Sequence, residues 1–232
     1  MDDVLVAKTV PYVPVAGSDA RFYVHRIYCV GQNYAAHAKE MGGSGREAPF
    51  FFTKPADAVL PVEAGETGAM PYPPQTSNLH HEVELVVAIG AGGSNISVDK
   101  ASGHIWGYAV GLDMTRRDLQ AAAKDKGRPW CTAKGFDHSA PIGEIHPAAS
   151  VKELGGISLK VNQALRQHSD VTDMIWSIAE IVAELSRFYT LQAGDLIFTG
   201  TPAGVSAVQA GDLLEAEVSG LGRLSVQIVT QE

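Results

Sequence analysis

The sequence predicts a single globular domain that combines many short β-strands with a few helices. The 232 residues are 45% hydrophobic and 19% charged, which suits a protein with one sizeable core. Short runs rich in β-branched residues recur along the chain, whereas only three segments are typical of helices. Residues 1–20 contain Pro11, Pro14 and Gly17 and are predicted to form an N-terminal arm, so we expect the domain to span residues 21–232.

Charge and cysteine content narrow the class of protein. The 26 acidic residues outnumber the 18 Lys and Arg residues and no basic cluster is present, which argues against nucleic acid or an anionic membrane as a partner. A small anionic substrate remains compatible if a metal ion and a few basic side chains concentrate positive charge locally. Cys29 and Cys131 have no metal-binding or redox spacing, and no apolar run has the length of a membrane span. We therefore expect a cytoplasmic protein.

The most informative stretch is the strand predicted over residues 79–90. Alternation along a strand places His80, Glu82 and Glu84 on one face. The two carboxylates would then lie about 7 Å apart, near enough to share one ion. Carboxylate oxygens suit Mg²⁺, Mn²⁺ or Ca²⁺. The alternative is an exposed strand start with acidic residues on its solvated face, so a metal site requires further ligands.

A strand predicted at residues 26–31 precedes a helix predicted at residues 33–43. Asn33 is the expected N-cap, alanines favour the helix, and two glycines end it. His37 and Glu40 are three residues apart, which allows the carboxylate to orient the imidazole as a general base. The alternative is an incidental charge pair on a solvated helix face.

Two lysines stand beside small or aromatic residues. The aromatic run Phe50–Phe52 is predicted to lie in the core, and Lys54 at its end either faces a pocket or, as is commoner for lysine, is exposed. Lys134 lies among small residues and glycine, so it could be held inward. Asp137 and His138 are predicted to form a turn.

A third carboxylate follows a second predicted strand. Residues 105–112 form an apolar run that ends at Asp113. A strand fixes an acidic residue at its end, while the loop that follows leaves room for a ligand. Asp113 is therefore the candidate for the third oxygen donor.

A helix is predicted over residues 115–123. Thr115 and Asp118 have the spacing of a capping box that would begin it. Arg117 and Gln120 share one face of this helix, close to the end of the preceding strand. Their donors are of the kind that a substrate carboxylate needs.

The rest of the chain is predicted to consist mainly of packing elements. We expect a hairpin at residues 157–167, an amphipathic helix at 172–189, a strand at 195–199 and a hairpin at 213–229. The Gly-rich loop at 200–204 contains Thr201, which could bind a carboxylate oxygen. A plain tight loop is the alternative.

The chain resembles the fumarylacetoacetate hydrolase family, and among its members the short acylpyruvate and fumarylpyruvate hydrolases. Five segments carry the resemblance in the expected order, namely Tyr34–Glu40, Glu82-x-Glu84, Asp113–Gln120, the residues around Lys134, and Gly194–Gly204. They are individually weak but specific as a set. A small departure is Asn162–Gln163, where Asn-Gly is usual, and it bears on turn strain rather than chemistry.

The resemblance implies an α+β fold, a β-rich mixed-sheet roll with short flanking helices, and a homodimer. It also implies Mg²⁺ or Mn²⁺, with Ca²⁺ as a further option, on a set of three ligands that consists of Glu82, Glu84 and Asp113. Within this frame His37, oriented by Glu40, would deprotonate a water molecule. Lys134 and Gln120 would stabilise the oxyanion, and Arg117 and Thr201 would anchor substrate carboxylates.

The expected activity is metal-dependent hydrolysis of the carbon–carbon bond of an acylpyruvate, a 2,4-diketo acid. Fumarylpyruvate, which gives fumarate and pyruvate, is the preferred substrate. The same residues would also serve an oxaloacetate decarboxylase or a 2-oxo acid tautomerase or isomerase, because all these reactions pass through an enolate. A non-catalytic metal or ligand binder is a third interpretation.

Overall fold

The computed structural model describes residues 10–40 and 46–231, with Glu40 described for its backbone alone. Its α-helices are α1 (Ala35–Glu40), α2 (Arg117–Asp125), α3 (Cys131–Lys134) and α4 (Ile178–Phe188). Its strands are β1 (Tyr12–Pro14), β2 (Arg21–Tyr23), β3 (Ile27–Gly31), β4 (Phe50–Lys54), β5 (Val59–Pro61), β6 (Thr67–Pro71), β7 (Leu79–His80), β8 (Val83–Ile89), β9 (Ile105–Leu112), β10 (Thr115–Arg116), β11 (Ala140–Ile142), β12 (His146–Pro147), β13 (Gly156–Val161), β14 (Ala164–Asp170), β15 (Leu196–Phe198), β16 (Ala207–Val208), β17 (Leu213–Val218) and β18 (Gly222–Val229). Short 3-10 helices occupy Ala56–Ala58, Val98–His104, Ala148–Ser150 and Val171–Asp173.

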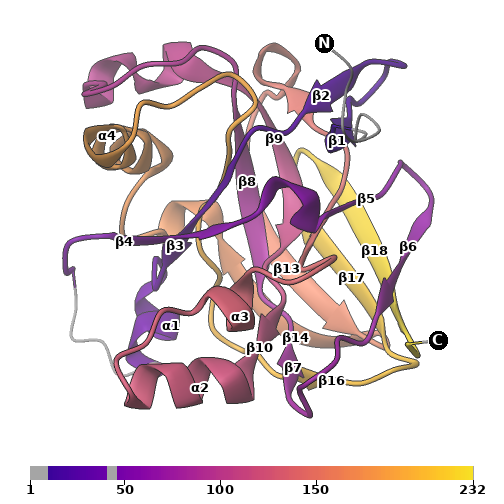
Figure 1. Cartoon of the computed structure of the whole chain (residues 1–232). Helices are drawn as coiled ribbons and strands as arrows, with labels where there is room; N and C mark the ends of the chain where they lie inside the picture. Colours follow the sequence, from indigo (N-terminus) through magenta and orange to yellow (C-terminus); the bar gives the residue numbers. More distant parts are fainter. Residues whose placement is uncertain (1–9, 41–45, 232) are drawn as a thin grey trace, which may run out of the picture.

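Two sheets dominate the molecule, and helices lie at its periphery (Figure 1). One sheet has eight strands, seven of them in the order β4-β3-β15-β8-β9-β11-β5 with β12 also paired to β9. The other has five strands in the order β14-β13-β17-β18-β6. Strand β15 runs parallel to β3 but antiparallel to β8, so the large sheet is mixed. The predicted α+β class, rich in mixed sheet with short flanking helices, is confirmed.

Strand β8 runs through the middle of the large sheet and is buried along its whole length. Its side chains alternate between two faces. Val83 and Leu85 enter the core between the two sheets, where they join Leu159 and Leu214 of the five-stranded sheet. Glu84 lies between them in the sequence and therefore points to the opposite face.

The predicted strand over residues 79–90 is broken into β7 and β8. Strand β7 leaves the large sheet and pairs with β10 and β16 in a separate three-stranded sheet. Glu82 lies at the break and is buried. The predicted strands at 26–31, 105–112 and 195–199 correspond to β3, β9 and β15.

The helix predicted after β3 is present as α1, but Asn33 is not its N-cap. The Asn33 amide donates to the carbonyl oxygens of Trp176 and Thr199, at 3.0 and 2.8 Å, and accepts from the backbone N–H of Trp176 at 2.8 Å. These backbone groups lie on distant segments, so the amide joins them rather than capping its own helix. The predicted end of this helix, at residue 43, lies outside the described residues.

The predicted capping box at the start of α2 is wrong. Thr115 belongs to β10, where it pairs with His80 and has an extended backbone, so the helix begins only at Arg117. Asp118 accepts hydrogen bonds from the Thr76 hydroxyl at 2.6 Å and from a neighbouring backbone N–H. The side chains of Thr115 and Asp118, whose spacing had suggested a cap, therefore contact other segments of the chain instead.

Helix α4 begins at Ile178, six residues later than predicted. A capping box between Ser177 and Glu180 starts it, and residues 171–173 form a separate 3-10 turn. The apolar stripe that includes Val182 and Leu185 packs against the large sheet. The amphipathic character of this helix was predicted and its start was misplaced.

The hairpins predicted at 157–167 and 213–229 are present as β13–β14 and β17–β18. In the first, Asn162 and Gln163 both have positive φ, 49° and 68°.

The described part of the predicted N-terminal arm includes β1, which pairs antiparallel with β2. Across residues 10–40 and 46–231, no helix combines the length and apolar character needed to cross a membrane.

Candidate active site

Three carboxylates meet at one end of β8 and β9. Glu82 precedes β8, Glu84 is its second residue, and Asp113 follows β9 directly. The two strands are antiparallel neighbours, with Val83 opposite Leu112, so the start of one lies beside the end of the other. Oxygen atoms of the three side chains lie within 4.8 Å of one another, and all three residues are buried. We call these three residues the carboxylate cluster.

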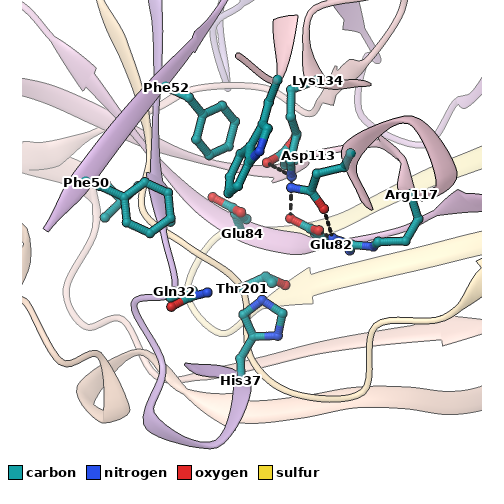
Figure 2. Close-up of a pocket in the computed structure, with 14 residues that line it drawn as sticks. Gln32, His37, Phe50, Phe52, Glu82, Glu84, Asp113, Arg117, Lys134 and Thr201 are labelled. Carbon is teal, nitrogen blue, oxygen red and sulfur yellow. Dashed lines mark hydrogen bonds and ion pairs between the residues drawn. The ribbon is translucent and has the colours of Figure 1, made fainter. Parts of the chain in front are cut away.

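Two cationic side chains surround the cluster on the pocket side (Figure 2). The Lys134 ammonium donates to Glu82 Oε2 at 2.8 Å and to Asp113 Oδ2 at 2.7 Å. The Arg117 guanidinium donates to Glu82 Oε1 and to Gln120 Oε1. Burial alone would lower the pKa of Lys134, but the charges of Asp113 and Glu82 raise it. Lys134 is therefore held charged and inward, as its sequence context had allowed.

Glu82 and Glu84 have opposite electrostatic surroundings. Burial favours the neutral form of Glu82, but the charges of Lys134 and Arg117 outweigh it and lower the pKa of this carboxyl well below its usual value. Burial and the neighbouring carboxylates raise the pKa of Glu84 well above its usual value. Among the described residues, no Lys or Arg side chain forms an ion pair with Glu84, which accepts the Gly200 N–H at 2.7 Å.

The cluster has the chemistry of a site for a hard divalent cation. Its ligand atoms are carboxylate oxygens, which Mg²⁺ and Mn²⁺ accept. Glu84 in particular is a buried carboxyl group beside two more, an arrangement that is costly without a cation. The three residues predicted as metal ligands thus come together and fit such an ion.

His37 lines the same pocket from α1 and is buried. Figure 2 shows its imidazole beside Thr201, across the pocket from Lys134. This position suits a base that acts on a molecule held between it and the carboxylate cluster. The side chain of Glu40 lies outside the described residues, so its pairing with His37 stays a prediction.

Thr201 lines the pocket, but its hydroxyl already has protein partners. It donates to the Val83 carbonyl at 2.8 Å and accepts from Gln167 Nε2 at 2.8 Å. Gln167 Oε1 in turn contacts His81 Nδ1 at 2.9 Å. Binding of a substrate carboxylate by Thr201 stays a prediction, and it would require rotation of the hydroxyl hydrogen away from Val83.

An aromatic wall was missed by the sequence analysis. Phe50, Phe52 and Trp130 line the pocket. The prediction that the run Phe50–Phe52 lies in the core holds for Phe51 and Phe52, which are partly buried against core clusters, but not for Phe50, which is exposed. The Trp130 ring lies 5.7 and 5.9 Å from the rings of Phe50 and Phe52. Period-two alternation along β4 was the available signal, because it places these two rings on one face.

Four further residues bear on the predictions for this region. Gln32 lines the pocket with φ of 56°, and nothing in the sequence marked it. Lys54 is fully buried, so the alternative of an exposed lysine is wrong. Asp137 and His138 form the predicted turn.

These features define a protein with a β-rich mixed-sheet fold and a buried acidic centre, and comparison with known proteins gives the family. Residues 26–229 match the profile described as Fumarylacetoacetate (FAA) hydrolase C-terminal. The chain belongs to the fumarylacetoacetate hydrolase family. The predicted resemblance, and the prediction of an enzyme of this family, are confirmed.

Particular relatives are similar over most of their length. A fumarylpyruvate hydrolase from a Ralstonia species is 50% identical over 183 residues, which cover 78% of this chain and 93% of the relative. An Escherichia coli protein, oxaloacetate tautomerase YcgM, is 40% identical over 85% of this chain and 90% of its own. The crystal structure of fumarylpyruvate hydrolase from Pseudomonas aeruginosa with Mn²⁺ and pyruvate matches with a TM-score of 0.97 and 53% identity, covering 99% of this chain and 100% of that one.

Proposed function

We propose that the protein is a metal-dependent acylpyruvate hydrolase that cleaves fumarylpyruvate into fumarate and pyruvate. The observation that carries the proposal is the carboxylate cluster in a pocket that also holds His37 and Lys134. The relatives support the same activity, since a fumarylpyruvate hydrolase is 50% identical and another, 53% identical, was crystallised with Mn²⁺ and pyruvate.

The charge of the site supports an anionic substrate. Lys54, Lys134 and Arg117 form ion pairs with Glu82 and Asp113, so three formal positive charges balance three negative ones once Glu84 is also ionised as a metal ligand. A divalent ion would add two positive charges to this balanced set. Fumarylpyruvate carries two carboxylates at neutral pH and would restore the balance. Mg²⁺ and Mn²⁺ are both compatible with these ligands.

The residues of the pocket have separable roles in this proposal. When bound, the ion would polarise substrate oxygens and stabilise negative charge. His37 removes a proton from the water that attacks the carbonyl carbon of the acyl group. The bond from that carbon to the methylene of the pyruvate part then breaks, and the pyruvate enolate that leaves takes up a proton. An ammonium has three N–H donors and Lys134 uses two of them on carboxylates, so the third is available to the developing oxyanion. Gln120 is the second donor, and Arg117 anchors a substrate carboxylate.

The direct test is an assay on chelator-treated protein to which Mn²⁺ or Mg²⁺ is restored. Loss of diketo-acid absorbance is followed with fumarylpyruvate and acetylpyruvate, and consumption of oxaloacetate is followed in parallel. We expect metal-dependent cleavage of the diketo acids, with fumarylpyruvate preferred. His37→Ala should lower this cleavage at least about 100-fold, because a positioned general base contributes at least that factor. Undiminished cleavage by the variant would remove His37 from the mechanism.

A tautomerase or decarboxylase acting on oxaloacetate is the second candidate. The observation in its favour is the similarity to relatives of that kind, such as the oxaloacetate tautomerase of Escherichia coli at 40% identity and an oxaloacetate decarboxylase of Dictyostelium discoideum at 39%. Turnover of oxaloacetate without cleavage of either diketo acid would select this candidate. A protein that turns over none of these compounds with metal present would support the non-catalytic binder instead.

Two further properties stay predictions. A homodimer is expected from the family resemblance, and sedimentation velocity or light scattering of the purified protein would test it. A cytoplasmic location is expected from the composition and would be tested by fractionation of the source cells.

A further inference from the structure

Lys54 is a charged residue in a place where a strand usually has an apolar one. It ends β4, an edge strand of the eight-stranded sheet, and of the five residues of that strand it alone is fully buried. Its side chain is 0% exposed. Burial of an ammonium is costly unless all its donors find partners. The position of Lys54 therefore calls for an explanation in its contacts.

The Lys54 ammonium has three oxygen partners on two other segments. It lies 2.8 Å from Asp113 Oδ1 and donates to the Met114 carbonyl at 3.2 Å. It also donates to the carbonyl of Lys134, the last residue of α3. Two donors thus meet backbone carbonyls, the ammonium forms an ion pair with Asp113 Oδ1, and these contacts join β4 to the end of β9 and to α3.

Two of these partners belong to the residues that carry the proposed chemistry. Asp113 presents Oδ1 to Lys54 and Oδ2 to the Lys134 ammonium, so Lys54 holds one oxygen of the carboxylate while the other contacts Lys134. The contact with the Lys134 carbonyl fixes the backbone from which the other ammonium extends. Lys54 itself is absent from the residues that line the pocket, so it acts through these two residues.

We propose that Lys54 is a positioning residue for the metal centre: it orients Asp113 as a ligand and holds Lys134 at the cluster. The inference rests on the metal dependence set out under Proposed function. Partners that orient metal ligands typically change metal affinity by about 10- to 100-fold when they are removed. We expect an effect of that size here.

If Lys54 acts only through its charge, its removal should strengthen Mn²⁺ binding, whereas if it orients Asp113, its removal should weaken Mn²⁺ binding. Lys54→Met removes a positive charge near the ion, and by charge alone Mn²⁺ would bind more tightly. Loss of orientation of Asp113 would instead weaken Mn²⁺ binding. Lys54→Arg keeps the charge and the donors, and Lys160→Met removes an exposed lysine from another strand as a matched control.

The experiment measures Mn²⁺ affinity of the full-length, chelator-treated proteins from the electron paramagnetic resonance signal of free Mn²⁺, without substrate. We expect binding at least tenfold weaker in Lys54→Met, recovery to within about threefold of wild type in Lys54→Arg, and no change in Lys160→Met. Unchanged or tighter binding by Lys54→Met would overturn the proposal. Circular dichroism establishes that each variant is folded before its affinity is compared.

A folding defect is handled by a second neutral variant. If Lys54→Met does not fold, Lys54→Gln takes its place, because an amide still donates to two carbonyls without a charge. If neither neutral variant folds, Lys54 serves the fold as a whole and the proposal is overturned. Wild-type protein that binds Mn²⁺ but cleaves no diketo acid would contradict the proposed reaction alone. Wild-type protein that binds no Mn²⁺ would overturn the metal site and this inference together.

Discussion

Glu82 and Glu84 belong to one cluster, yet the charges around them differ, and the difference has consequences for stability. Glu82 contacts Lys134 and Arg117, and its neutralisation would leave the buried Lys134 and the half-buried Arg117 short of a partner. Glu84 has no such contact among the described residues and holds its proton more tightly. Conservative substitutions at these two positions should therefore differ in their effect on the free energy of unfolding, although both should abolish metal binding.

In metal-free protein near neutral pH, we expect Glu82→Gln to lower the free energy of unfolding by about 3–5 kcal/mol, because it breaks a buried ion pair. Glu84→Gln should change it by less than about 1 kcal/mol, because the raised pKa of Glu84 favours its neutral form and no ion pair with Lys or Arg is lost among the described residues. Both variants should lose Mn²⁺ binding. Urea unfolding with chelator present measures the difference, and equal destabilisation by the two variants would contradict the assignment of charge.

Metal binding should release a proton from Glu84. Its pKa is raised in the metal-free protein, and a carboxylate must be deprotonated to act as a ligand. Because the metal-free state holds a proton that the metal-bound state lacks, affinity for Mn²⁺ should increase as pH rises and level off above the pKa of Glu84. Titration calorimetry at a series of pH values, in buffers of different ionisation enthalpy, should show proton release on binding that diminishes as the pH rises. Release of none would show that Glu84 is already ionised.

The sequence identified the three proposed metal ligands because their signals are local. Alternation along a strand groups Glu82 with Glu84, and Asp113 stands at the end of an apolar run. Lys54 and Gln32 carried no such signal, because their placement depends on contacts with segments far away in the chain. Thr201 was placed in the pocket, whereas its hydrogen bonds to Val83 and Gln167 could not be foreseen.

At the scale of elements, the turn between β13 and β14 has a strained backbone that one substitution should relieve. Asn162 and Gln163 both adopt positive φ, as a two-residue type I′ hairpin turn requires, and glycine is favoured at the second position. Gln163→Gly should raise the free energy of unfolding by about 1 kcal/mol, since it removes the cost of a left-handed non-glycine residue. Urea unfolding measures the gain, and Arg166→Gly, in the adjacent strand, is the control that should destabilise.

Elements were predicted best where a single physical cause determines them. Strands β3 and β9 follow from apolar runs, and the two long hairpins follow from alternation with turn residues between. Helix starts were less predictable, because a capping pattern competes with tertiary contacts. Thr115 pairs in strand β10 instead of capping α2. The capping box that does begin a helix, formed by Ser177 and Glu180, lay inside a segment already predicted as helix.

At the scale of the whole molecule, a bound ion should stabilise the fold. The proposed ligands come from the start of β8 and the end of β9, two strands that pair at the centre of the large sheet and are brought together only in the folded chain. At a free Mn²⁺ concentration 100 times its Kd, the free energy of unfolding should rise by about 2.7 kcal/mol. Urea unfolding with Mn²⁺ or with chelator measures this increment. Glu84→Gln is the matched control and should show almost none, and an equal gain in that variant would point to a different ion site.

The three basic side chains around Glu82 and Asp113 also bear on the order of events in making the active protein. In the metal-free protein they compensate these two carboxylates, while the raised pKa of Glu84 favours its neutral form, so the centre carries no excess negative charge. The chain can then fold around this centre before an ion binds, unlike small zinc domains that are unfolded without metal. Folding and metal loading are then separate steps. The supply of divalent ion would control what fraction of the molecules is active, while the amount of folded protein stays nearly constant.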